Sequence, residues 1–241
     1  MRNATNLKIK NIIFDLDGTL IYRLPRRVFF IQDYLEDHGI IMNASQQKAA
    51  GQWSHKFWEN ITTYDPNENS LNGNPWVQLW LDYLDHYSDI LGLPKHSLDS
   101  LFQDLAVRIE EERGIEQVMA GALDVLPRLK SLGYRMGVLS NRHKPIAPVI
   151  ENHGLSKFFD AVHSSGEMNA EKPDPEIFFR YLEVFGGTPG ETIYVGDNYW
   201  LDGIGAKNAG IQPVLLDLYG WFDDFDIPTI SRFEDLISFI D

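Results

Sequence analysis

The sequence predicts an α/β fold, a doubly wound and mainly parallel sheet interrupted by an all-helical insert. Two observations favour it. Short apolar runs of strand-forming residues alternate with helical patterns near the start and in the second half of the chain, as in βα units. Residues 25–112 instead show helical periodicity and no convincing strand. We therefore expect a core from residues 1–24 and 113–241 and a helical domain from residues 25–112.

The expected core strands are four apolar runs, at residues 12–14, 134–139, 192–195 and 213–216. Helical patterns lie between them. Residues 122–132 have apolar residues at helical spacing and end at Gly133, which suits a left-handed C-cap. Residues 176–185 repeat the pattern, with Pro175 near the start. These segments predict βα units packed around one sheet.

The insert is expected to contain several helices. Val28, Ile31 and Leu35 form one apolar face before Gly39. Pro75 suits the start of a second helix, and Ser97 suits the N-cap of a third that runs to Arg113. A further helix is expected over residues 45–60.

Four tryptophans fall within this insert. Their spacing favours the core of a small helical bundle over the lining of a substrate pocket. They are Trp53, Trp58, Trp76 and Trp80.

Composition narrows the function. Hydrophobic residues make up 44% and charged residues 23% of the chain, which is ordinary for a globular protein. The formal net charge of −14 disfavours nucleic acid as a partner, since phosphate backbones are bound by clustered Lys and Arg. The chain has no cysteine, which excludes disulfides and thiolate metal sites. With no apolar run long enough for a bilayer and no signal-peptide pattern at the start, we expect no membrane contact and a cytoplasmic location.

Acidic residues follow the first strand. Asp15 and Asp17 stand two residues apart at its end, just before Gly18. Ligand sites of open α/β sheets lie at the carboxyl ends of strands, so the two acids are placed where a substrate would bind. An isolated Asp-x-Asp-Gly is also an ordinary turn, so this motif alone predicts little.

Further polar residues follow the later strands. Ser140-Asn141 comes after the second expected strand, Lys172 precedes Pro173 and a helix, and Gly196-Asp197 follows the third strand, with Asp202 five residues on. Each fragment alone is typical of a cap or a loop. Together they place acids, a hydroxyl group and a lysine at successive strand ends of one sheet.

This ordered set resembles the haloacid dehalogenase (HAD) superfamily, in its subgroup with a helical cap inserted after the first motif. The four motifs are DLDGT from Asp15, SN from Ser140, KP from Lys172 and GDNYWLD from Gly196. The resemblance covers essentially the whole chain and implies a Rossmann-like core with a cap.

The motifs also predict chemical roles. Asp15 suits a nucleophile that forms an aspartyl-phosphate, and Asp17 suits the acid that protonates the leaving oxygen and then activates water. Crowded acids around Asp17 are expected to favour a proton on it at the start. Phosphoryl oxygens would be held by Ser140 and Lys172, with backbone N–H groups near Leu16, Asp17 and Asn141.

An all-oxygen set predicts a metal site. Asp15, Asp197 and the backbone carbonyl of Asp17 suit a hard cation, and Mg²⁺ is the natural choice. Asp202 supports the site either by holding a metal-bound water or by orienting Lys172. The spacing does not choose between these two roles.

The resemblance leaves the reaction partly open, since the superfamily includes dehalogenases, phosphatases, phosphonatases and phosphomutases. Dehalogenases lack an acid at the position of Asp17, so its presence favours phosphoryl transfer. We expect magnesium-dependent hydrolysis of a small phosphorylated metabolite by a monomer or homodimer. A phosphomutase acting on a sugar phosphate is the alternative, and a phospho-acceptor module of the response-regulator type is a more distant one.

Overall fold

The computed structural model describes residues 9–59, 75–112 and 114–240, and it divides into two compact units. The sheet unit comprises Met1–Tyr22 and Gln117–Asp241, and the helical unit comprises Arg23–Glu116. Buried hydrophobic residues occur in both units.

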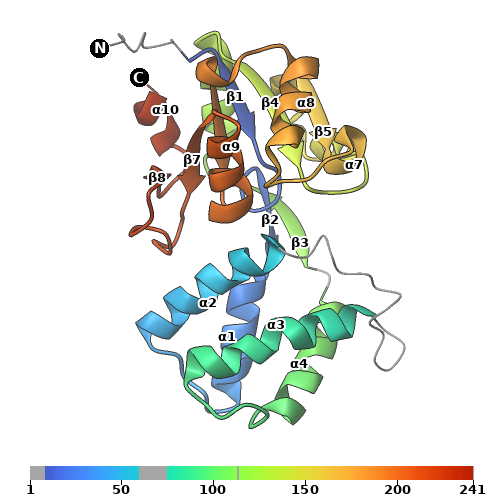
Figure 1. Ribbon diagram of the computed structural model, residues 1–241, viewed down its shortest axis with the longest axis vertical. Helices are drawn as coiled ribbons and strands as arrows, with labels where there is room; N and C mark the ends of the chain where they lie inside the picture. The colour runs from blue at the N-terminus through green and yellow to red at the C-terminus, as the bar shows by residue number, and fades with distance from the viewer. Residues whose placement is uncertain (1–8, 60–74, 113, 241) are drawn as a thin grey trace. The chain divides into compact units, whose positions relative to one another are not determined.

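The sheet unit is built on six strands in the order β5-β4-β1-β6-β7-β8, and every neighbouring pair is parallel (Figure 1). The strands are β1 (Asn11–Phe14), β4 (Arg135–Ser140), β5 (Ala161–Ser164), β6 (Thr192–Gly196), β7 (Gln212–Leu216) and β8 (Thr229–Ile230). The chain runs outward from β1 through β4 to β5, then returns to β6 on the other side of β1 and continues outward. This reversal defines a doubly wound sheet, so the predicted fold class is confirmed.

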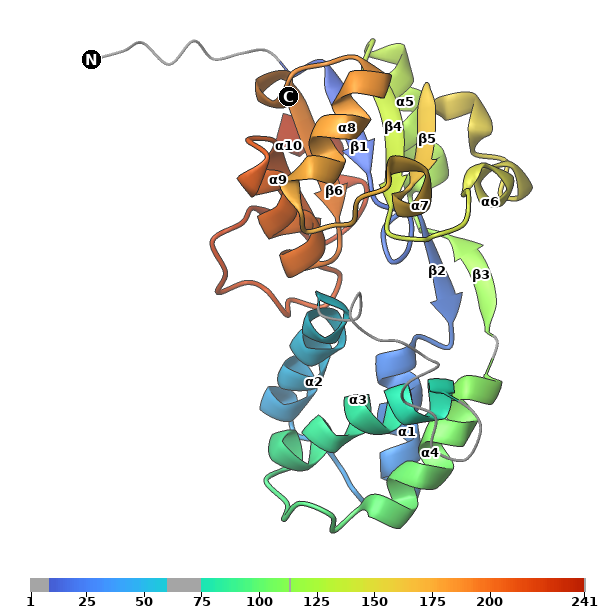
Figure 2. The same ribbon diagram turned by 45° about the vertical axis from the view of Figure 1, so that its right-hand side comes forward.

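Helices cover both faces of this sheet. Along β1, Ile12 and Phe14 belong to one hydrophobic cluster and Ile13 to another, as the alternation of a strand requires. The first cluster is covered by α5 (Ala122–Ser131), α6 (Ala147–Asn152) and α10 (Asp235–Ile240). The second is covered by α8 (Pro175–Phe185) and α9 (Gly205–Asn208), which lie side by side in both views (Figures 1 and 2).

Short helical turns complete the unit. They are η2 (Ser156–Phe158), α7 (Ser165–Met168), η3 (Pro189–Glu191) and the π-helix η4 (Tyr199–Ile204). In η4 the N–H of Gly203 donates to the carbonyl of Asn198, five residues earlier, at 3.1 Å. The Asn198 side chain caps this helix by accepting from the N–H groups of Trp200 and Leu201, both at 3.0 Å.

The helical unit contains α1 (Arg27–Asp37), α2 (Ala44–Lys56), α3 (Pro75–Leu91) and α4 (Asp99–Glu111). Asn43 begins α2 with a capping box shared with Gln46. The expected cap at Ser97 is wrong, because Leu98 occupies the N-cap of α4 and makes no side-chain cap bond. Asn60 and Arg113, the expected ends of two helices, lie outside the described residues.

The tryptophans of the insert do not share one environment. Trp80 is buried, and Trp53 donates its indole N–H to the carbonyl of Tyr83 at 2.9 Å. Trp76 is 47% exposed, so the interpretation as bundle core does not extend to it.

The sequence patterns missed four strands. β5 and β8 add to the large sheet, and β2 (Ile21–Leu24) pairs with β3 (Ile115–Val118) in a separate two-stranded sheet. All four have two to four residues and a half-exposed or polar pattern, which gives weak periodicity. Among the described residues, no helix has the length and apolar character needed to cross a membrane.

Candidate active site

Three of the expected residues meet because of strand register. Phe14 of β1 lies beside Val138 of β4 and Val195 of β6. Asp15 follows Phe14 directly, while Ser140 and Asp197 come two residues after their own register partners. The site therefore forms at the carboxyl edge of the three central strands, where the strand order reverses.

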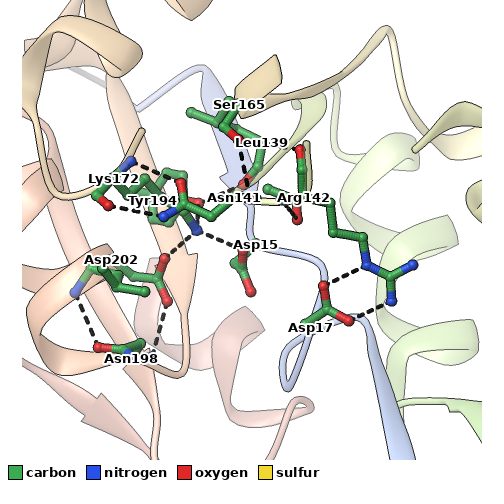
Figure 3. A network of polar contacts seen from close by, with 12 residues as sticks. Asp15, Asp17, Leu139, Asn141, Arg142, Ser165, Lys172, Tyr194, Asn198 and Asp202 are labelled. Carbon is green, nitrogen blue, oxygen red and sulfur yellow. Dashed lines mark hydrogen bonds and ion pairs between the residues drawn. The ribbon is translucent and has the colours of Figure 1, made fainter. Parts of the chain in front are cut away.

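Lys172 lies at the centre of a buried polar network (Figure 3). Its Nζ donates to Asp15 Oδ1 at 2.6 Å, to Asp202 Oδ1 at 2.6 Å and to the Tyr194 hydroxyl at 3.0 Å. The lysine is 2% exposed, so water does not substitute for these partners. All three N–H groups of the ammonium are thus satisfied by protein.

The backbone of Lys172 is held separately by Asn141. The Asn141 side-chain carbonyl accepts from the Lys172 N–H at 2.8 Å, and its NH₂ donates to the Lys172 carbonyl at 2.9 Å. One side chain therefore binds both backbone polar groups of a residue, as a neighbouring antiparallel strand would. Asn141, expected near the phosphoryl group, also fixes the lysine.

Burial sets the electrostatics of this cluster. It raises the pKa of Asp15 from 3.8 to about 7, although the Lys172 ammonium acts to lower that pKa. The Asp202 and Asp17 carboxylates add to the rise. Burial also acts to lower the pKa of Lys172, but Asp15 and Asp202 outweigh it, and the pKa of Lys172 lies well above its usual value. The two acids therefore favour the charged form of the lysine.

Two glycines allow close approach. Gly18 has a φ of +85°, and a Cβ there would lie 2.0 Å from Asp197 Oδ2. At Gly196 a Cβ would lie 2.3 Å from the Asp202 carboxyl carbon. The absence of a side chain at these two positions therefore leaves room for the carboxylates of Asp197 and Asp202.

The carboxylates fit a hard cation. Asp15, Asp197 and Asp202 each offer an oxygen, and these oxygens all lie within 4.8 Å of one another. Both oxygens of Asp202 already accept hydrogen bonds, from Lys172 Nζ and from the Asn198 N–H at 2.9 Å. The carboxylate of Asp202 is thus held on one oxygen by Lys172 and on the other by the backbone of Asn198.

Asp17 lies apart from this buried cluster. Its two oxygens accept from Arg142, Oδ2 from Nε at 2.8 Å and Oδ1 from Nη2 at 2.6 Å (Figure 3). Its side chain is half exposed. The expectation that crowded acids surround Asp17 needs correction, because a guanidinium contacts both of its oxygens.

The remaining expected residues lie at the same edge. Ser140 is buried, and its Oγ accepts from the Arg142 N–H at 3.2 Å, which leaves the hydroxyl proton for another acceptor. Leu16 points its side chain into the hydrophobic core, so only its backbone can serve a ligand.

Sequence reasoning missed Tyr194 and Arg142. Tyr194 reads as one more apolar residue of a strand, although a hydroxyl in a fully buried run directly before Gly196-Asp197 is a usable signal. Arg142 follows Ser140-Asn141 immediately, but sequence does not show that it reaches Asp17.

Comparison with known proteins gives the family. The model of haloacid dehalogenase-like hydrolases matches residues 9–210. A phosphoglycolate phosphatase of Pseudomonas syringae pv. tomato is 27% identical over 215 residues, which cover 88% of this chain and 70% of that protein.

Solved structures share the fold. A predicted phosphoglycolate phosphatase from Haemophilus somnus 129PT has a TM-score of 0.57 at 22% identity, covering 97% of this chain and 98% of that one. A 2-haloacid dehalogenase from Pseudomonas syringae pv. tomato DC3000 has a TM-score of 0.53 at 19% identity, covering 95% and 97%. The fold alone thus suits both phosphatases and dehalogenases. Because the family model matches most of its length, the chain belongs to the haloacid dehalogenase-like hydrolases.

Proposed function

We propose that this chain hydrolyses phosphate monoesters of small metabolites, with magnesium, through a phosphorylated Asp15. The observation that carries the proposal is the buried 2.6 Å contact between Asp15 and Lys172 at the edge of the sheet. A carboxylate alone repels a phosphate dianion, and an ammonium against it offsets that repulsion. Asp17 favours phosphate esters over halides, since an alkoxide leaving group needs a proton and a halide does not.

In the first step an oxygen of Asp15 attacks phosphorus and the bond to the ester oxygen breaks. Asp17 exchanges its contact with Arg142 for one with the substrate, takes up a proton from solvent as it does so, and passes that proton to the leaving oxygen. Lys172 keeps its contacts with Asp15, Asp202 and Tyr194 throughout, and these occupy all three of its N–H groups. In place of the expected hydrogen bond to a phosphoryl oxygen, its positive charge offsets the charge of the phosphoryl group.

In the second step water attacks the phosphorus and the bond to Asp15 breaks, which releases inorganic phosphate. Asp17 accepts the proton of that water and releases it to solvent, and so returns to its starting state. The Ser140 hydroxyl and backbone N–H groups near Leu16, Asp17 and Asn141 donate to the phosphoryl oxygens.

Magnesium would be held by Asp15, Asp197 and the backbone carbonyl of Asp17, and would draw negative charge from the phosphoryl oxygens. The donors are all oxygen, which suits this ion. Asp202 is left to Lys172.

The helical unit is proposed as the cap that selects the substrate. It follows the loop that carries Asp17 almost directly, since its first residue is Arg23. A cap excludes bulky substrates, which favours small phosphorylated metabolites over phosphoproteins.

The test is an assay of the purified protein with Mg²⁺ against phosphorylated sugars, nucleotides and small acids, phosphoglycolate among them. Asp15→Asn is the blank. We expect release of inorganic phosphate from at least one ester, far above that blank. No turnover on the whole panel would contradict the proposal, as would a stable phosphoprotein or transfer of phosphate between two positions of a sugar.

Asp17→Asn is expected to lower kcat by about 10²–10⁴-fold for an alkyl phosphate, since proton transfer to the leaving group is lost. The loss should be much smaller for p-nitrophenyl phosphate, whose phenolate leaves without a proton. Steady-state kinetics on both esters measure this difference. Asp124→Asn, which changes an exposed acid of α5, is the control. Equal losses on the two esters would remove Asp17 from the role of acid.

Chelation of divalent metal with EDTA is expected to abolish turnover, and Mg²⁺ should restore it. Calorimetric titration of Asp197→Asn with Mg²⁺ should show an affinity for the metal lower by at least about tenfold. Loss of a residue that only hydrogen-bonds to a metal ligand already costs about tenfold, so loss of a ligand should cost no less. Asp223→Asn, which changes an exposed acid, should bind as the unmodified protein does. Unchanged affinity in Asp197→Asn would mean that Asp197 is not a ligand.

A further inference from the structure

We propose that Tyr194 is a positioning residue of the active site, whose hydroxyl fixes the direction of the Lys172 ammonium. This inference rests on the proposed function, because it assigns a group that acts through Lys172. Tyr194 lies on β6, three residues before Asp197. Its side chain is fully buried.

The Tyr194 hydroxyl has two defined partners. It accepts from Lys172 Nζ at 3.0 Å and donates to the carbonyl of Leu139 at 2.8 Å (Figure 3). Leu139 directly precedes Ser140 on β4. The phenol thus joins the lysine to the strand that carries the expected phosphate-binding hydroxyl.

The ammonium has three N–H groups and three acceptors. Two acceptors are carboxylates, on Asp15 and Asp202, and both distances are 2.6 Å. A tetrahedral ammonium with two donors committed has one direction left, and Tyr194 occupies it. Without the phenol oxygen, the third N–H would lack a partner in a place that water does not reach. The ammonium could then satisfy this N–H only by shifting its contacts with the two carboxylates.

The ring and the hydroxyl of Tyr194 have separable roles. The ring packs edge-on against Phe178, with centroids 5.1 Å apart, in the hydrophobic cluster under α8. Phenylalanine keeps that packing and removes only the oxygen. A change in Tyr194→Phe can therefore be assigned to the hydroxyl.

Tyr181 offers a matched control within the same cluster. It is also fully buried, and its hydroxyl donates to a strand carbonyl, that of Ala161, at 2.9 Å. None of the hydrogen bonds described for Tyr181 involves Lys172. Tyr181→Phe thus removes an equivalent buried hydrogen bond and leaves the lysine untouched.

The experiment compares Tyr194→Phe and Tyr181→Phe in steady-state hydrolysis of the best ester from the panel, with Mg²⁺. We expect kcat of Tyr194→Phe to fall by about tenfold with KM changed less than twofold, since the loss concerns orientation in the transition state. Tyr181→Phe should keep both constants within about twofold. Equal kcat values in the two variants would overturn the inference, and so would a changed KM with unchanged kcat.

A second readout is independent of turnover. In protein labelled with ¹⁵N-lysine, the Nζ resonance of Lys172 is identified by its loss in Lys172→Met. That resonance should shift in Tyr194→Phe and stay in place in Tyr181→Phe. If the chain hydrolyses no ester while the resonance shifts as expected, the proposed function fails and the contact stands. If it hydrolyses esters and Tyr194→Phe matches Tyr181→Phe, the inference alone fails.

Discussion

Lys172→Met is expected to abolish turnover and to lower the free energy of unfolding by about 3–5 kcal/mol, the usual cost of removing one partner from a buried ion pair. Lys172 is the cation in contact with both Asp15 and Asp202. Methionine fills a similar volume, so packing changes little. The loss arises because two buried carboxylates then face each other without compensation.

Urea denaturation with EDTA present measures the stability term without a contribution from bound metal. Lys144→Met, which changes an exposed lysine three residues after Asn141, is the matched control. If Lys172→Met unfolds at the same urea concentration as this control, the buried ammonium does not contribute to the free energy of unfolding as expected.

Asp15→Asn is expected to abolish turnover as completely, yet to leave the protein as stable or more stable at pH 8. It removes one of two buried acids and leaves Lys172 paired with Asp202. Burial raises the pKa of Asp15 from 3.8 to about 7, so the folded state disfavours its ionisation. Wild-type stability should therefore fall as pH rises between about 4 and 7, by up to about 4 kcal/mol, and asparagine escapes that loss.

Unfolding curves at pH 5 and pH 8, in EDTA, measure this difference for wild type and Asp15→Asn. The gap between them should widen toward pH 8. Asp124→Asn should instead follow the wild type at both values. A flat wild-type stability over this range, or an Asp15→Asn protein less stable than wild type at pH 8, would contradict the electrostatic account of the cluster.

Sequence alone predicted the parts of this molecule that depend on position along strands. Asp15, Ser140 and Asp197 each follow an apolar run, and parallel register then places them at one edge. It did not predict partners that depend on side-chain reach. Arg142 contacts Asp17 across 125 positions of sequence, and the Tyr194 hydroxyl accepts from Lys172 across 22 positions.

The missed strands have a different cause. β5 and β3 are four residues long, and their exposure alternates or stays intermediate, so tertiary pairing decides their conformation. Ser97 illustrates the same limit at a helix end, since the N-cap of α4 lies one residue later, at Leu98, and makes no side-chain cap bond. Neither outcome is encoded in local preference.

The π-helix that follows Asp197 and contains Asp202 has a consequence for how this protein tolerates insertions and deletions. Its wide turn, Tyr199–Ile204, contains one residue more than an α-helical turn closed by the same bond would hold. Loss of a single residue there would rotate Asp202 by about 100° about the helix axis and carry its carboxylate off Lys172. The number of residues between Asp197 and Asp202 therefore determines whether the Asp202 carboxylate reaches Lys172.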